Sequence, residues 1–234
     1  MSARILILFP STFEAEAVFK NYGASHNCKL GGSCNFTTLA GTECKALVCG
    51  IGCEKSAERV LKAIENFCPS DIILCGFAGA CTPDLACGDF VCESESESIE
   101  KVLHKQKIQR GKIAFSNVVA DTQAKEKLAS EGFDAVEMES EIFKNAIGAD
   151  GDEFRPNFTH IRCISDDATT DMPAEFLDSM LNRETGAINV SIPVIIKLIF
   201  KSPKIVLSLI KFSKNAASAK SIYAQKLTQI FSSL

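Results

Sequence analysis

Residues 46–80 read ALVCGIGCEKSAERVLKAIENFCPSDIILCGFAGA, and this stretch decides the fold class. The apolar run 46–49 has the length of a strand. From Glu54 the apolar residues recur with a helical period, and Pro69 ends that helix. Its apolar face is made by Ala57, Val60, Leu61 and Ile64. A second apolar run, 71–75, follows, and strand, helix and strand in this order predict a β-α-β unit with a parallel sheet.

The sequence on either side continues the alternation of strands and helices. Upstream, the apolar run Arg4–Phe9 predicts another strand. Downstream, we expect the strand 71–75 to end before Gly76–Gly79, and the polar stretch Glu93–Arg110 to be a connection or an exposed segment. Further strands are predicted at 90–92, 112–119, 134–138 and 159–165, a helix at 139–146, and helices beyond Pro173 that are broken at Pro193 and near Pro203. This pattern favours a single α/β domain, residues 1–234.

Length and composition agree with one folded core. The 234 residues are 46% apolar and 23% charged, which is typical of a globular protein and excludes a disordered one. The first residues lack a basic region, an apolar core and a small-residue cleavage site, so we expect no secretory signal and a cytoplasmic location. The apolar run Val194–Phe200 is too short for a bilayer span, which needs about 20 residues.

The cysteines predict neither disulfides nor a metal site. Eleven are present, which is an odd number, and no two form a Cys-x-x-Cys pair. The close pair Cys49 and Cys53 has no histidines beside it. Disulfide frameworks belong to short secreted chains, so we expect reduced and mostly buried thiols in preference to a structural zinc site. No metal and no cofactor are expected.

The net charge of −4 conceals an asymmetry along the chain. After Glu184 there are seven lysines and no acidic residue, so the last fifty residues carry +7 and the first 184 carry −11. Two interpretations of this basic tail stay open. Its helices can pack on the sheet and complete a dimer, or they can lie on an anionic membrane through lysine stems and an apolar face. That face would be made by Ile195, Leu198, Ile199, Leu207 and Ile210.

Acidic residues follow several of the predicted strands. Glu14 comes just after the first strand, Glu139 after a later one and Asp166 after the last. Ligands of wound α/β sheets bind at the carboxyl ends of the strands, which makes these carboxylates candidates for chemistry. The alternative for each is that it caps the next helix. Gly50-Ile51-Gly52 does not complete a dinucleotide-binding fingerprint, because Lys55 occupies the third glycine position.

The order of these motifs resembles the purine nucleoside phosphorylase and nucleosidase superfamily, particularly its methylthioadenosine/S-adenosylhomocysteine nucleosidase branch. The matching segments are Ile5–Glu16, Gly50–Gly52, Gly76–Gly79, Leu85–Val91, Val136–Glu139 and Arg162–Asp166. The C-terminal part is similar to hopanoid-associated nucleoside phosphorylases, and Gly76–Ala80 to futalosine hydrolases. The resemblance implies a three-layer sandwich, with a mixed central sheet flanked by helices, that cleaves the N-glycosidic bond of a purine nucleoside.

The resemblance also implies roles for individual side chains. Cleavage builds negative charge on the departing purine, and an acid that protonates N7 relieves it. Asp166 inherits that role, and Ser165 orients it. Glu139 accepts the 2′- and 3′-hydroxyls of the ribose, and Met138 packs on the sugar. Further substrate contacts are expected from Phe77, Ala78, Gly79 and Val119.

The nucleophile arrives on the other face of the sugar, and Glu14 is expected to activate it, with Glu16 as the alternative. Phosphate as the nucleophile would benefit from arginine donors. No arginine lies between Pro10 and Leu30, where phosphorylases of the superfamily keep one. The sequence therefore favours hydrolysis, with phosphorolysis and nucleoside binding without turnover as alternatives.

The resemblance to the nucleosidase branch also has implications for the substrate and for the oligomeric state. It implies a small-molecule adenine nucleoside with a 5′ substituent, a homodimer and no nucleic-acid partner. Only about twenty residues separate Asp89 from Gly111, fewer than in that branch. The shorter segment can leave the 5′ side of the pocket open to a bulky substituent, or another segment can cover that side instead.

Overall fold

The computed structural model describes residues 3–51, 54–148, 155–170, 181–182, 187–188 and 203–234. The strands are β1 (Arg4–Phe9), β2 (Ser33–Thr37), β3 (Glu43–Val48), β4 (Asp71–Ala80), β5 (Phe90–Ser94), β6 (Gln109–Arg110), β7 (Ile113–Phe115), β8 (Ala135–Glu137), β9 (Asn157–Asp166), β10 (Leu181–Asn182) and β11 (Ala187–Ile188). The helices are α1 (Thr12–Asn21), α2 (Glu54–Phe67), α3 (Glu97–Lys105), α4 (Thr122–Ser130), α5 (Ser140–Ile147) and α8 (Pro203–Ser233), with a 3-10 turn at Ser25–Asn27.

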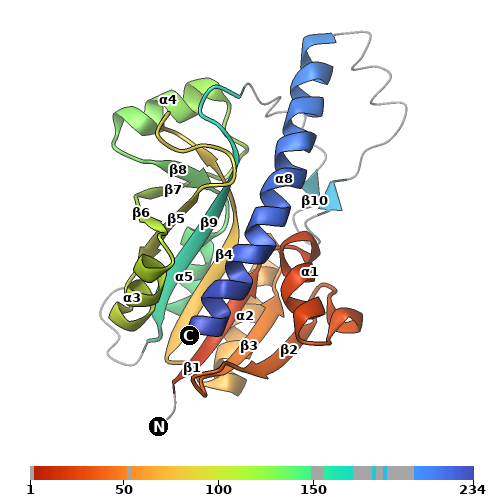
Figure 1. Ribbon diagram of the computed structural model, residues 1–234, viewed down its shortest axis with the longest axis vertical. Coiled ribbons are helices and arrows are strands. Elements are labelled where there is room, and N and C mark those ends of the chain that lie inside the picture. Colours follow the sequence, from red (N-terminus) through yellow and green to blue (C-terminus); the bar gives the residue numbers. More distant parts are fainter. Residues whose placement is uncertain (1–2, 52–53, 149–154, 171–180, 183–186, 189–202) are drawn as a thin grey trace.

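A mixed sheet forms the centre of the molecule (Figure 1). Its strand order is β2-β3-β1-β4-β9-β5-β6, and β8 pairs with β4 and with β7 beside this path. Strands β3, β1, β4 and β9 are parallel, whereas β2, β5 and β8 run antiparallel to β3, β9 and β4. The predicted β-α-β unit is β3-α2-β4, and β1 lies between its two strands.

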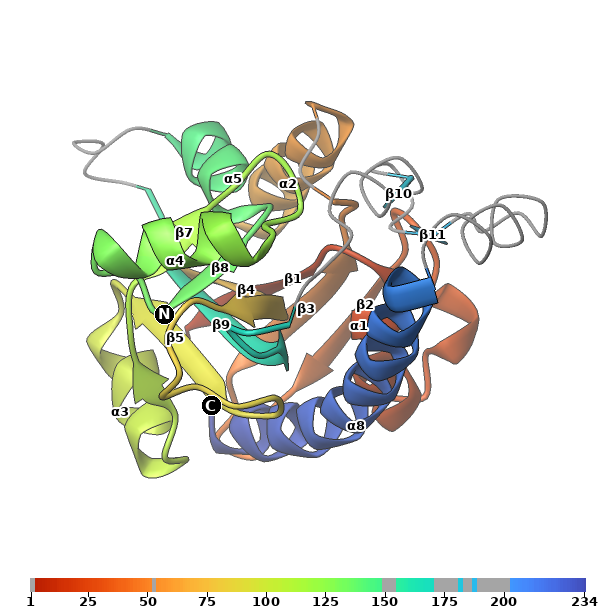
Figure 2. The same ribbon diagram turned by 90° about the horizontal axis from the view of Figure 1, so that it is seen from above.

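Helices cover both faces of this sheet (Figure 2). Ile5, Ile7 and Phe9 of β1 belong to the core shared with α1, α3 and α8, whereas Leu6 and Leu8 belong to the core shared with α2 and α5. Successive side chains of a strand point to opposite faces, so a strand buried on both sides reads as a continuous apolar run. The expected three-layer sandwich with a mixed central sheet is confirmed.

The strand expected at 71–75 is longer than predicted, because Gly76–Gly79 continue β4 as far as Ala80. The glycines are needed for space. A Cβ on Gly76 would collide with the guanidinium of Arg162, and a Cβ on Gly79 would lie 3.0 Å from Oδ2 of Asp166. The longer strand therefore runs beneath the side chains of Arg162 and Asp166.

Four other expectations need correction. The segment Glu93–Arg110 is not merely an exposed connection, because it holds α3, whose Ile99 and Leu103 are buried four residues apart. Leu61 is 40% exposed although the helical pattern placed it on the apolar face of α2. The strand expected at 112–119 is only β7, and α4 and β2 were not anticipated. The short strands β10 and β11 lie where helices were expected.

The described cysteines fit the expectation of reduced thiols. None of the ten forms a disulfide with another described cysteine, and seven are buried. Desolvation by burial raises the pKa of several of these thiols, among them Cys34 to about 11 and Cys44 to about 12. Raised thiol pKa values keep these groups neutral, so they pack as small apolar side chains.

The end of the basic tail packs on the sheet. In α8, whose side chains are described from residue 217 onward, the buried residues are Ala219, Tyr223, Leu227, Ile230 and Phe231. Both described lysines of this part contact the body of the protein. Lys220 Nζ lies 2.6 Å from Oε2 of Glu16, and Lys226 Nζ donates to the carbonyl of Gln106 at 3.1 Å. This part of the tail follows the packing interpretation.

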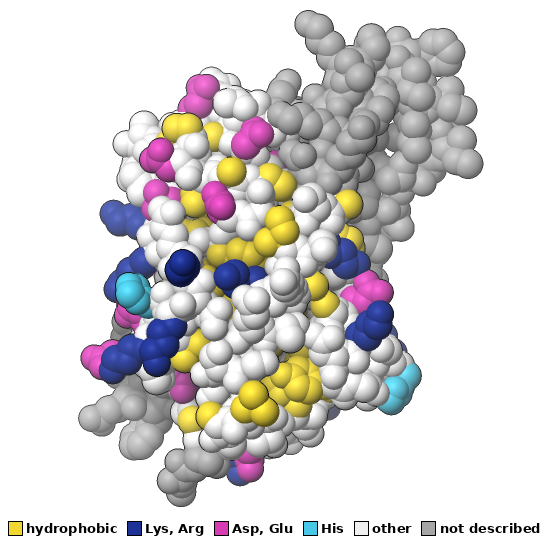
Figure 3. Space-filling view, viewed as in Figure 1, with side chains coloured by type: hydrophobic (Ala, Val, Ile, Leu, Met, Phe, Trp, Pro, Cys, Tyr) yellow, Lys and Arg dark blue, Asp and Glu magenta, His cyan; other side chains and the backbone are white. Residues whose placement is uncertain are grey.

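The rest of the membrane interpretation concerns residues that are not described. Ile195, Leu198 and Ile199 lie outside the described residues, as do the side chains of Leu207 and Ile210. On the face in Figure 3, Lys and Arg side chains occur on both edges with Asp and Glu beside them. Among the helices that the structure describes, none is long and apolar enough to cross a membrane.

Candidate functional site

Glu14, Glu139 and Asp166 gather beside the carboxyl-terminal halves of β4 and β9. These strands are parallel and paired along their length, with Gly76 opposite Arg162 and Gly79 opposite Asp166. Seen from above in Figure 2, α4 lies on one side of these strands and α8 on the other. Side chains from α1, α4, α5 and α8 can therefore reach the same short part of β4.

Asp166, at the end of β9, is buried, and both oxygens of its carboxylate accept hydrogen bonds. Its Oδ1 accepts a hydrogen bond from Ser165 Oγ at 2.7 Å, which is the orienting contact expected for Ser165. Its Oδ2 accepts from Nζ of Lys125, a residue that the sequence did not single out. Lys125 is 1% exposed and also donates to the carbonyl of Asp167 at 3.1 Å. Asp166 is therefore one half of a buried ion pair.

Helix α4 delivers Lys125 to this position. The helix begins after Asp121, whose side chain caps it by accepting from the backbone N–H of Ala124 at 2.8 Å. Lys125 follows within the first turn of the helix, and its side chain extends to the surface of β4 at Gly79. A side chain at Gly79 would meet Cε of Lys125 at 3.0 Å, so the glycine makes room for the lysine.

A second buried cation, Arg162 of β9, holds the two carboxylates of the Glu137-Met138-Glu139 segment. Its Nη2 donates to Glu137 and lies 3.2 Å from Oε2 of Glu139. Glu137 also accepts from the backbone N–H groups of Glu139 and Ser140, at 3.0 Å and 3.1 Å, and thereby caps α5. Glu137 therefore serves the helix, which leaves Glu139 as the carboxylate available to a ligand.

Glu14 approaches β4 from α1. Ser11 and Glu14 form a capping box, in which Ser11 Oγ donates to Oε2 of Glu14 at 2.7 Å. Its Oε1 accepts from the backbone N–H of Phe77 at 3.2 Å. The alternative, Glu16, has a side chain that is 63% exposed and pairs with Lys220. Only Glu14 of these two lies against β4.

Burial raises the pKa of Glu139 and of Glu14, the two carboxyl groups that feel the charge of Arg162. Desolvation raises the pKa of Glu139 to about 8, opposed by the charge of Arg162 and reinforced by the nearby Glu137 and Glu14. Desolvation also raises the pKa of Glu14, against hydrogen bonds from Ser11 and the charge of Arg162. Each pKa therefore depends on the same guanidinium, which makes Glu14, Glu139 and Arg162 one electrostatic unit.

Aromatic side chains line the β4 side of the site. Phe77 packs on Tyr223 of α8, with ring centroids 4.8 Å apart, and on Phe13 of α1 at 5.8 Å. Met138 and Val119, expected as substrate contacts, are both half-buried. Met138 joins β8 to α5, and Val119 lies in the loop between β7 and α4. Ala78 is buried, and its carbonyl accepts from Ser165 Oγ at 3.3 Å.

Sequence reasoning missed Lys125, Arg162, Glu137 and Tyr223. Arg162 had a usable signal, because a charged residue inside the apolar run Thr159–Ser165 demands buried partners. No such signal marks Lys125, because the sequence around it has the pattern of an ordinary polar helix and includes Lys127 two residues away.

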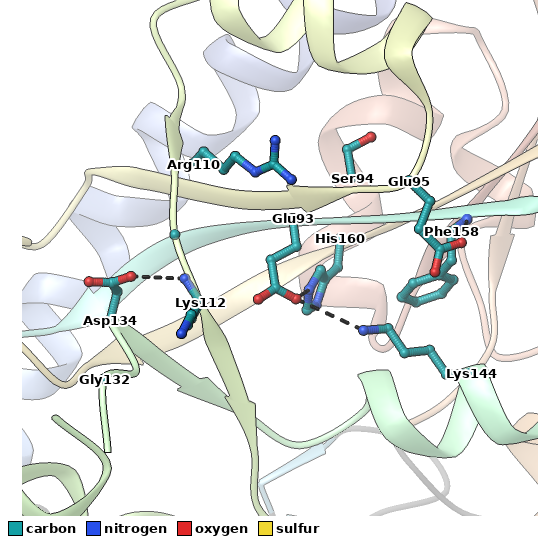
Figure 4. A pocket seen from close by; sticks show the side chains of 11 residues that line it. Glu93, Ser94, Glu95, Arg110, Lys112, Gly132, Asp134, Lys144, Phe158 and His160 are labelled. Carbon is teal, nitrogen blue, oxygen red and sulfur yellow. Dashed lines mark hydrogen bonds and ion pairs between the residues drawn. The ribbon is translucent and has the colours of Figure 1, made fainter. Parts of the chain in front are cut away.

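A separate cavity of about 510 Å³ lies near the opposite end of β9 (Figure 4). It is lined by Phe158 and His160, and His160 is about 20 Å from Asp166 at the rise of an extended strand. His160 Nε2 is 2.7 Å from Oε2 of Glu93, and Lys144 Nζ is 3.9 Å from the same atom. None of the predicted site residues lines this cavity.

The sequence matches one family model. The model of the phosphorylase superfamily matches residues 4–98, which include β1, α1, α2, β4 and β5. The resemblance inferred from the motifs is confirmed for this part of the chain. No curated protein matches the sequence.

Solved structures with the same fold cover almost the whole chain. A 5′-methylthioadenosine/S-adenosylhomocysteine nucleosidase from Helicobacter pylori, with butyl-thio-DADMe-Immucillin-A, has a TM-score of 0.64 and 17% identity and covers 100% of both chains. An S-adenosylhomocysteine nucleosidase from Streptococcus pyogenes, in complex with 5-methylthiotubericidin, has a TM-score of 0.60 and 20% identity, covering 100% of this chain and 98% of that one. A futalosine hydrolase mutant from Helicobacter pylori has a TM-score of 0.61 and 20% identity, covering 99% and 100%.

Proposed function

We propose that this protein cleaves the N-glycosidic bond of a purine nucleoside, with water as the nucleophile, and releases the free base. The observation that carries the proposal is the convergence of Glu14, Glu139 and Asp166 on the stretch of β4 from Gly76 to Gly79. The three carboxylates come from three separate elements. Solved structures of this fold include proteins named as nucleosidases and a futalosine hydrolase, which supports this class of reaction.

Asp166 is the group proposed to protonate the leaving base. It lies at the carboxyl end of β9, where ligands of α/β sheets bind. Ser165 fixes its orientation through the 2.7 Å hydrogen bond to Oδ1. A positioned general acid accelerates such a step by roughly 10²–10⁴-fold, which corresponds to about 3–5 kcal/mol.

Glu139 is proposed to hold the ribose. The two oxygens of one carboxyl group can accept from the 2′- and 3′-hydroxyls. Arg162 fixes the group from below, at 3.2 Å from Oε2. Met138 precedes Glu139 and is proposed to pack on the sugar ring.

Glu14 is proposed to take the proton from the attacking water. Burial raises its pKa, and a base works best when its pKa lies near the working pH. Arg162 is close to Glu14, but its side chain is 0% exposed and its Nη2 is directed to Glu137 and Glu139. An arginine so enclosed is poorly placed to bind phosphate, which favours hydrolysis over phosphorolysis.

The substrate proposed is an adenine nucleoside with a 5′ substituent, by analogy with the nucleosidases that share the fold. A homodimer, a cytoplasmic location and contact of the basic tail with an anionic membrane are further proposals that follow from the sequence. Co-sedimentation with anionic vesicles at low salt tests the membrane contact: a protein that stays in the supernatant does not use the tail for binding.

A panel assay tests the proposed activity. Purified protein is incubated with adenosine, inosine, 5′-methylthioadenosine and S-adenosylhomocysteine, each with and without inorganic phosphate, and the released base is quantified. The proposal expects release of base from at least one nucleoside at a rate independent of phosphate. Release that requires phosphate would establish phosphorolysis, and no release would leave only nucleoside binding.

A further inference from the structure

We propose that the acid acting on the leaving base is the buried ion pair of Lys125 and Asp166, in which Lys125 is a positioning residue that holds the carboxylate and resupplies its proton. This inference rests on the proposed function and deepens it. An isolated Asp166 would have to carry its own proton, whereas here its Oδ2 already accepts from an ammonium group.

The geometry gives Lys125 no other evident purpose. Lysine is almost never fully buried unless it is paired, and Lys125 is 1% exposed. Its ammonium group donates to Oδ2 of Asp166 and to the carbonyl of Asp167. Both acceptors lie at the carboxyl end of β9, where the proposed site is located. A residue needed only to stabilise α4 could keep its ammonium group in solvent, as Lys127 does in the same helix with a side chain that is 77% exposed.

The sequence of β4 is adapted to this ion pair. A Cβ at Gly79 would lie 3.0 Å from Oδ2 of Asp166, 3.0 Å from Cε of Lys125 and 3.3 Å from its Nζ. Contacts this short would push the two side chains apart. Gly79 therefore keeps open the space in which the ion pair forms.

Groups already described donate and accept all the protons that move in this step. As the glycosidic bond breaks, its electron pair passes to the purine, and N7 takes a proton from the carboxyl group of Asp166. That proton comes from Nζ of Lys125, so Asp166 is a carboxylate before and after the step and Lys125 becomes a neutral amine. Glu14 gains one proton from the attacking water. After the base leaves, proton exchange with solvent resets Glu14 and Lys125.

The test compares turnover with binding in Lys125→Met and Lys125→Gln. Neither variant has a proton to supply, and glutamine keeps a hydrogen-bond donor for Asp166. The two readouts are kcat on the best purine nucleoside of the panel and Kd for 7-deazaadenosine, which has carbon in place of N7 and cannot be protonated there. Lys127→Met, a change of the exposed lysine on the same helix, is the matched control, and thermal melting verifies folding.

The proposal expects kcat to fall by roughly 100-fold or more in both variants, in line with loss of a general acid, with Kd within about three-fold of wild type. Lys127→Met should change neither readout. A folded Lys125 variant that keeps kcat within about five-fold, or that loses turnover and binding alike, would overturn it. Those outcomes leave the proposed function intact, whereas a wild-type protein that releases no base from any nucleoside defeats both.

Discussion

Nη2 of Arg162 lies 3.2 Å from Oε2 of Glu139 and also donates to Glu137, so one guanidinium holds two carboxylates in the interior. Removing one member of a buried ion pair costs about 3–5 kcal/mol, because the partner is left charged and unpaired. The cluster is thus a rigid support for Glu139. The charge of Glu14 also contributes to the raised pKa of Glu139.

Glu139→Gln should impair ribonucleosides far more than their 2′-deoxy analogues. A hydrogen bond contributes about 0.5–1.5 kcal/mol, so we expect kcat/KM for the ribonucleoside to fall by roughly two- to ten-fold beyond the loss for the deoxy substrate. Steady-state kinetics on the matched pair measures this. Glu141→Gln, an exposed carboxylate of the same helix, is the control. Equal losses on both substrates would show that Glu139 is structural.

The same substitution should change how stability depends on pH. The folded-state pKa of Glu139 is about 8, above the unfolded value of about 4.3. The stabilisation linked to its protonation is complete below about pH 4 and is lost as pH rises through 8. The wild type should therefore lose stability relative to Glu139→Gln between pH 5 and 8, by at most about 1.4 kcal/mol per pH unit. Thermal melting of both proteins tests this, and parallel curves would contradict the raised pKa.

Asp166→Asn should keep the fold and lose turnover. The amide is nearly isosteric and its oxygen can still accept from Lys125, but it cannot pass a proton to N7. A loss of about two decades or more in kcat is expected. Asp167→Asn alters the neighbouring side chain, which accepts from Thr170 Oγ1 at 2.7 Å, and should leave most of the activity. Near-native rates for Asp166→Asn would refute its role as the acid.

Substitutions at Glu14 and Glu16 should separate the two candidates for the nucleophile side. Glu14→Gln preserves the capping box, because glutamine also serves in that motif, yet it removes the base. We expect a loss of about 100-fold or more in kcat with little change in melting temperature. Glu16→Gln breaks only an exposed pair with Lys220 and should leave kcat nearly unchanged. The reverse ranking would identify Glu16 as the base.

Several strands were accessible to sequence reasoning because burial on both faces leaves a plain signature. The run Ile5–Phe9 supplies both cores and is a strand as expected. The failures have physical causes. Gly76 and Gly79 were expected to lie beyond the strand, since spacing along the chain does not reveal that buried side chains from β9 and α4 need the space above them.

The candidate site was predictable only where a residue follows a strand or belongs to a motif. Glu14, Glu139 and Asp166 met that condition. Lys125 did not, because the value of a charged residue in a polar helix depends on what it faces in three dimensions. The position of Lys125 in α4 places its side chain over Gly79. The sequence does not show that α4 lies beside β4, because that arrangement exists only in the folded protein.

The most direct test of the central claim is the fate of oxygen in water enriched with ¹⁸O. The protein is incubated with its best nucleoside in such water, with phosphate present, and the sugar product is examined by mass spectrometry. Attack by water activated by Glu14 predicts a free sugar that carries one ¹⁸O at its anomeric carbon. A sugar phosphate without ¹⁸O, or no cleavage at all, would contradict the account.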